Sequence, residues 1–111
     1  MSPASKFQIL LLFIFTMFVL VYFQLDAEFR RFPMDKSKPR KFDELYLQVE
    51  KLHRLKSDPF VITYSDKDGD LLPINNDDNF NLALQTAKHI LRVMIQRKGM
   101  LFYQYFLIFI M

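Results

Sequence analysis

The sequence of 111 residues contains no cysteine, two glycines and two histidines. Without cysteine the chain can form neither a disulfide nor a thiolate metal site, which fits a reducing compartment. Gly69 and Gly99 are too few to form a glycine-rich phosphate-binding loop. His53 and His89 have no partner at ligand spacing, so both are interpreted as residues of a helix surface or boundary. The chain carries no catalytic constellation, and the sequence predicts that it is not an enzyme.

Basic residues are dispersed along the chain, and the most concentrated charge is negative. Residues 64–78 hold five carboxylates and one lysine, a formal charge of −4, whereas the whole chain carries +3. The remainder of the chain therefore carries +7. Because its cations are dispersed and the densest charge is negative, nucleic acid is a poor candidate partner. The acidic stretch binds a metal ion, forms a solvated turn or receives a cationic partner. Its carboxylates belong to Asp66, Asp68, Asp70, Asp77 and Asp78.

The spacing Asp-x-Asp-x-Asp from Asp66 resembles the start of a calcium loop. An EF-hand loop needs glycine at its sixth position and a bidentate carboxylate at its twelfth, between two helices. Counted from Asp66, the sixth position is Leu71, and the apolar residues on both sides alternate as they do in strands. The sequence therefore disfavours calcium and predicts no metal ion and no other cofactor.

An Asp-Gly pair between two apolar runs predicts a β-hairpin. Residues 60–64 are β-branched and aromatic and supply the first strand, and residues 71–74 pair back on it. Pro73 has no amide donor, so the second strand should be short and lie at an edge of the sheet. A turn needs one or two aspartates rather than five, and the excess favours a cationic protein partner.

The apolar N-terminal run has two incompatible interpretations. Residues 7–25 carry no charge and are long enough to cross a bilayer as a helix. The cations that follow would then place the downstream domain in the cytosol. Residues 19–32 are also rich in β-branched and aromatic residues, which predicts a hairpin with Phe29 and Phe32 packing and Arg30 and Arg31 exposed. Residues 19–25 cannot belong to both structures.

Two amphipathic helices are predicted after this run. The first covers residues 41–55 and ends before Pro59, which cannot continue a helix. The second begins at Asn76 or Asp77, because either side chain can cap it. Residues 90–96 are almost continuously apolar and predict a final strand at the centre of the sheet. The two buried stripes are Phe42, Leu45, Tyr46, Val49 and Leu52 in the first helix and Phe80, Ala83, Leu84 and Ala87 in the second.

These elements follow the order strand, strand, helix, strand, strand, helix, strand. This order predicts an α+β fold, a ubiquitin-like β-grasp in which a mixed five-stranded sheet carries two helices on one face. Apolar extensions lie on both sides of it. The predicted division is an N-terminal extension at residues 1–18, a domain at 19–98 and an apolar tail at 99–111. The tail is too short to span a bilayer as a helix and is an aggregation hazard if uncovered.

The acidic motif Tyr64-Ser65-Asp66-Lys67-Asp68-Gly69-Asp70, followed by Asn76-Asp77-Asp78, resembles that of the Phox-and-Bem-one (PB-one) domain. Residues 27–32 and 69–78 look most like the PB-one domain of the partitioning-defective (Par-six) cell-polarity scaffolds. The resemblance covers about residues 26–98. It implies a ubiquitin-like fold and head-to-tail pairing, in which the acidic motif of one domain docks on a basic cluster of another.

For the scaffold family, the implied partner is the PB-one domain of atypical protein kinase C. The resemblance implies a heterodimer that acts in cell-polarity signalling in the cytoplasm and at the cell cortex. Carried over by position, the cation acceptors are Asp66, Asp68, Asp70 and Asp78, with Asp77 secondary. The alternative function is a single-pass membrane protein anchored through residues 7–25, with the PB-one-like domain in the cytosol.

Three features depart from the family pattern. Residues 19–24 hold no lysine where the family has a basic first strand, so we expect docking through the acidic face alone and no polymer. The GTPase-binding and peptide-binding regions of the scaffolds have no counterpart in the sequence, and we expect those activities to be absent. Both apolar ends lie outside the resemblance, which leads to the hypothesis of a fragmentary gene model or a minor isoform.

Overall fold

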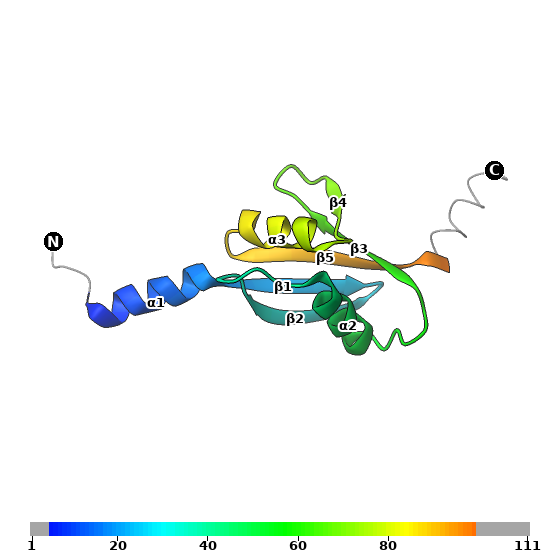
Figure 1. The fold of residues 1–111 in the computed structure, drawn as a ribbon, viewed down its shortest axis with the longest axis horizontal. Coiled ribbons are helices and arrows are strands. Elements are labelled where there is room, and N and C mark those ends of the chain that lie inside the picture. Colours follow the sequence, from blue (N-terminus) through cyan, green and yellow to red (C-terminus); the bar gives the residue numbers. More distant parts are fainter. Residues whose placement is uncertain (1–4, 100–111) are drawn as a thin grey trace.

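The computed structural model describes residues 5–99, and its strands form a single sheet (Figure 1). The strand order is β2-β1-β5-β3-β4, with β1 parallel to β5 and the other neighbours antiparallel. This mixed five-stranded sheet confirms the predicted α+β class. The elements are α1 (Lys6–Met17), β1 (Phe18–Leu25), β2 (Glu28–Asp35), α2 (Phe42–Leu52), β3 (Phe60–Ser65), β4 (Leu71–Pro73), α3 (Asp77–Thr86) and β5 (Ile90–Arg97).

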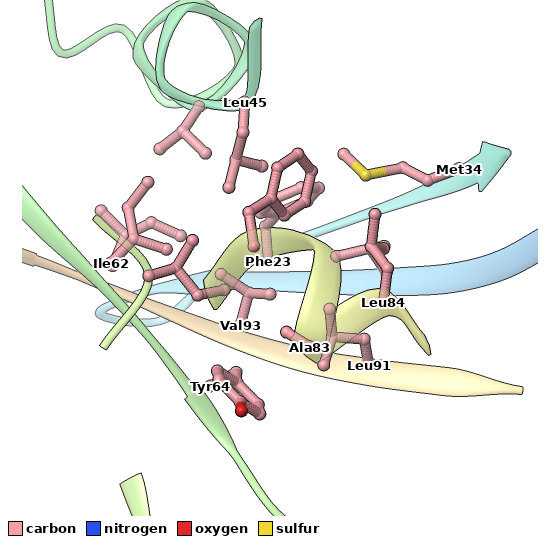
Figure 2. Packing of buried hydrophobic residues seen from close by; sticks show 14 of the residues in the cluster. Phe23, Met34, Leu45, Ile62, Tyr64, Ala83, Leu84, Leu91 and Val93 are labelled. Carbon is pink, nitrogen blue, oxygen red and sulfur yellow. The ribbon is translucent and has the colours of Figure 1, made fainter. Parts of the chain in front are cut away.

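The hydrophobic core lies between one face of the sheet and the helices α2 and α3. Alternate residues of β1, β3 and β5 are buried, because successive side chains of a strand point to opposite faces. Figure 2 shows Phe23 of β1 and Val93 of β5 packed with Leu45 of α2 and Leu84 of α3. β5 lies between β1 and β3, so the central position predicted for residues 90–96 is confirmed.

Both predicted amphipathic helices form, and each buries the expected stripe. In α2, Leu45 and Val49 are buried and the other stripe residues pack against the core. α3 buries Phe80, Ala83 and Leu84. The spacing of apolar residues at three and four positions therefore identified the core-facing side of both helices correctly.

The membrane-spanning helix that one interpretation assigned to residues 7–25 is wrong. α1 ends at Met17, and the chain continues from Phe18 as β1. Because β1 pairs with both β2 and β5, a helix through Leu25 would deprive two strands of their partner. Within residues 5–99, the helices all fall short of the length and apolar character that a bilayer span requires.

α1 is a third helix beyond the two predicted, and it projects from the end of the sheet (Figure 1). Ser5 caps it, with its hydroxyl accepting from the Gln8 amide at 3.1 Å. None of its described side chains belongs to the core cluster. Several of them are large, apolar and exposed, namely Phe7, Ile9, Leu10, Leu11, Leu12, Phe13 and Ile14.

The hairpin of β1 and β2 forms, but the packing predicted for its two phenylalanines is wrong. Phe29 is 60% exposed and Phe32 is 43% exposed. Residues three apart in a strand point to opposite faces, so these two side chains cannot share one packed surface. Phe29 lies opposite Gln24 on the open face of the sheet, and Met34 is the buried residue of this edge strand.

One buried side chain in the described range is polar. His53 is the C-cap of α2, which agrees with its interpretation as a histidine of a helix surface or boundary. Its side chain, however, is inaccessible to solvent. Its Nδ1 lies 3.3 Å from Glu28 Oε1, and neither ring nitrogen has a hydrogen-bond partner within residues 5–99. Burial lowers the pKa of His53 more than the Glu28 carboxylate raises it, and Arg30 and Arg97 lower it further. His53 is therefore held neutral in the folded protein.

This environment predicts that the domain loses stability in mild acid. A histidine with a lowered folded-state pKa takes up its proton in the unfolded chain first, so the unfolded state gains protons as the pH falls. The free energy of unfolding, measured by urea titration, should decrease between about pH 7 and about pH 5, around the ordinary histidine pKa of about 6.5. His53→Leu should flatten this dependence, whereas His89→Gln, at an exposed histidine, should keep it. An equal slope in both variants would contradict the assignment.

Candidate functional site

The acidic turn, residues 66–70, joins β3 to β4 at one edge of the sheet. The two strands pair antiparallel, with Ser65 opposite Leu71 and Thr63 opposite Pro73. β4 has three residues and is an edge strand, which confirms the prediction made from the missing amide of Pro73. The turn between the strands therefore projects from an edge, where a partner can reach it.

Asp66 organises the turn. Its Oδ1 accepts hydrogen bonds from the backbone amides of Asp68 and Asp70, each at 2.9 Å. The backbone closes around the same residues, because the Asp66 amide donates to the Asp70 carbonyl at 2.9 Å. Gly69 has a φ of +82°, a conformation that favours glycine. The conformation of the turn is thus stabilised by the Asp66 carboxylate, which is also one of the five carboxylates of the acidic stretch.

Asp68 and Asp70 point their charge outward. Both side chains are exposed, and no group within residues 5–99 forms a hydrogen bond or ion pair with either carboxylate. No three His, Asp or Glu side chains of that range are placed to share a metal ion. The turn therefore offers two unpaired anions on a defined backbone.

The start of α3 carries the second part of the acidic stretch. Asn76 is the N-cap, and its side chain accepts from the Asn79 amide at 2.8 Å while the Asn79 side chain accepts from the Asn76 amide at 3.2 Å. This reciprocal arrangement confirms one of the two caps predicted here. Asp77 and Asp78 occupy the first turn, where the helix dipole favours negative charge.

Asp77 and Asp78 differ in what they contact. Asp77 Oδ1 accepts from the backbone amide of Phe42 at 2.7 Å, and its Oδ2 lies 3.8 Å from Lys41 Nζ. Lys41 is the N-cap of α2 and offers that helix no side-chain cap, so Asp77 supplies the missing acceptor from another element. Asp78 is exposed and has no partner within the described residues.

The five aspartates therefore form two groups with β4 between them. Asp66, Asp68 and Asp70 lie together in the turn, whereas Asp77 and Asp78 lie past the far end of β4. All five aspartates are recognisable in the sequence as a concentration of negative charge. The bond between Asp77 and the N-terminus of α2 is not, because it joins residues far apart in the chain.

The open face of the sheet, which the helices do not cover, carries positive charge. Tyr22 of β1 lies opposite Arg31 of β2 and Arg92 of β5. Both guanidinium groups lie over its ring, at 6.0 and 5.8 Å from the centroid. β1 itself has no lysine, and docking through the acidic face alone stays a prediction.

Comparison with known proteins links this geometry to one family. The family model of the PB1 domain matches residues 19–98. The human protein "Partitioning defective 6 homolog gamma" is 50% identical over 72 residues, which are 65% of this chain and 19% of that protein. "Partitioning defective protein 6" of Caenorhabditis elegans is 44% identical over 78 residues, 68% of this chain and 25% of that protein. The chain thus spans about a fifth to a quarter of these relatives.

Solved structures support the fold. The cryo-EM structure of the AtNBR1-PB1 filament superposes with a TM-score of 0.64 at 20% identity, covering 72% of this chain and 97% of that one. The AtNBR1-PB1 domain superposes with a TM-score of 0.63 at 16% identity, with the same coverage. At such low identity the likeness concerns the fold, and it confirms the predicted ubiquitin-like β-grasp.

The hydrogen bonds in the turn predict a difference in stability between its aspartates. Asp66→Ala removes the acceptor of two backbone amides and should lower the free energy of unfolding by about 1–2 kcal/mol. Asp68→Ala removes no contact and should change it by less than about 0.5 kcal/mol. Urea unfolding of both variants measures the difference, and equal stabilities would contradict the structural role of Asp66.

The two aspartates of α3 provide a second matched pair. Asp77→Ala leaves the Phe42 amide without its acceptor and should cost about 1 kcal/mol beyond any change seen in Asp78→Ala. Both variants lose a charge from the same helix turn, so the shared dipole effect cancels in the comparison. Thermal unfolding of the two variants tests this, and a larger loss in Asp78→Ala would overturn the assignment.

Proposed function

The chain belongs to the PB1 domain family, and on that premise we propose that it is a non-catalytic interaction module whose acidic side docks on the basic face of another PB1 domain. The proposed partner is the PB1 domain of an atypical protein kinase C, bound as a heterodimer in cell-polarity signalling at the cell cortex. Residues 19–98 are the proposed interaction unit. The similarity to partitioning-defective proteins supports the polarity role.

One observation carries this proposal: Asp68 and Asp70 are unpaired and exposed on a turn whose shape Asp66 already fixes. A single surface ion pair contributes only about 0–1 kcal/mol. Several carboxylates on one rigid turn act together, because their summed field steers a cationic partner and sets its orientation. Since the turn is ordered by its own hydrogen bonds, little conformational entropy remains to be lost on binding.

The contacts rank the proposed acceptors. Asp68, Asp70 and Asp78 have no competing partner within residues 5–99 and are the primary acceptors for lysine or arginine. Asp66 has one oxygen committed to backbone amides and contributes its other oxygen. Asp77 is secondary, because both of its oxygens already face Phe42 and Lys41.

The proposal predicts that reversing one charge on the turn abolishes binding. Asp70→Arg replaces an acceptor by a cation and should remove detectable binding to the PB1 domain of an atypical protein kinase C, because two cations then face each other. Isothermal titration calorimetry with that isolated domain measures the effect. The circular dichroism spectrum of the variant should match that of the unsubstituted chain, because the Asp70 side chain has no contact within residues 5–99 to lose.

Asp43→Arg is the matched control for this experiment. Asp43 is an exposed carboxylate in the first turn of α2, outside the acidic turn and the start of α3. The control changes the net charge by the same amount and should reduce affinity far less than Asp70→Arg. Equal losses in the two variants would mean that only overall charge matters, and binding retained by Asp70→Arg would exclude docking through the turn.

A further inference from the structure

A groove lies between α3, the β3–β4 hairpin and the beginning of β5. Its volume is about 960 Å³, and Asp66 is one of its lining residues. It opens where two strands separate: β3 pairs with β5 only as far as Tyr64 opposite Val93, while β5 continues back to Ile90 against β1. α3 begins beyond β4 and runs back toward the acidic turn, so its second half forms another wall. The groove is therefore continuous with the acidic turn.

Part of the surface of this groove is apolar. Tyr64, Ala83 and Leu91 are buried residues that line it from β3, α3 and β5, and Figure 2 labels all three where the strands separate. Leu72 of β4 and Leu82 of α3 also line it, yet they are 38% and 57% exposed. Two leucines from different elements thus face a common space that the domain itself leaves open.

The charges around the groove determine which way an occupant can lie. Asp66 and Lys67 line it on the side of the turn, where the unpaired carboxylates of Asp68 and Asp70 leave the local charge negative. Lys88 lines it on the side of the α3–β5 connection and is exposed. Arg92 of β5 also contributes to the lining, although its guanidinium group lies over Tyr22 on the open face. A cation of a partner protein is attracted to the turn and repelled by the positive charge at the α3–β5 connection. The partner side chains next to that cation are therefore directed along the apolar part of the groove.

We propose that this groove receives an aliphatic side chain of the partner, next in space to the cation that docks on the acidic turn. The inference rests on the proposed docking of a basic PB1 domain, and it adds an apolar contact that would distinguish one basic PB1 domain from another. Charge attracts any basic surface, whereas an apolar contact requires a side chain of suitable size at a fixed distance from the cation. Leu82 and Leu72 are then specificity-determining residues for the partner.

Removing one leucine of the groove tests this proposal. Leu82→Ala in the full chain should weaken binding to the PB1 domain of an atypical protein kinase C about three- to tenfold by calorimetry, since the contact loses apolar area. Leu82→Met should restore most of the affinity, because methionine has a similar volume. The loss should have the same factor at low and high salt, whereas the penalty of Asp70→Ala should shrink as salt screens the charges.

Leu47→Ala is the matched control, because Leu47 is an exposed leucine of α2 outside the groove, at 62% exposure. It should bind as the unsubstituted chain does. If Leu82→Ala and Leu72→Ala also bind normally while Asp70→Arg does not, the groove is unused and the inference is overturned although acidic docking stands. If the unsubstituted chain fails to bind, the proposed function falls and takes the inference with it.

Discussion

The parallel pairing of β1 with β5 is the contact on which the rest of the structure depends. β1 has hydrogen-bonded neighbours on both sides, and four of its side chains are at most 3% exposed. Burying each such side chain contributes about 1.5–3 kcal/mol. A helix over the same residues would satisfy its own backbone but remove an interior strand of the sheet. The apolar run is therefore divided at Met17 by what the later strands require, not by its composition. The four buried side chains are Val19, Val21, Phe23 and Leu25.

The carboxylates of the acidic stretch have different tasks. Asp66 and Asp77 accept hydrogen bonds from backbone amides, one within the turn and one at the start of α2. Charge-assisted bonds of this kind offset part of the repulsion between neighbouring anions. Asp68, Asp70 and Asp78 are left unpaired within the described residues. Asp68 and Asp70 lie on backbone that the Asp66 carboxylate fixes, and Asp78 lies in the helix turn that Asn76 and Asn79 cap. Aspartate thus both stabilises the backbone of the acidic stretch and supplies its negative charge.

Local patterns predicted what depends on local physics. The helical stripes, the Asn76 cap and the edge position of β4 follow from spacing, side-chain chemistry and the missing amide of proline. Non-local facts could not be predicted in this way. The Asp77 bond to Phe42 joins residues 35 positions apart. His53 was correctly placed at a helix boundary, but its burial depends on the β1–β2 hairpin packing beside it, and nothing in the flanking sequence indicates that.

Charge asymmetry connects the acidic turn to the groove beside it. The acidic stretch carries −4 on a chain whose remainder carries +7, so a basic partner is repelled by most of the surface and attracted at one edge. Attraction at one edge sets an orientation but does not distinguish one basic partner from another. Because α3 runs back toward the turn, the proposed docking orientation would also bring the partner against Leu72 and Leu82. Selectivity would then come from short-range packing, which acts only after long-range charge has positioned the two surfaces.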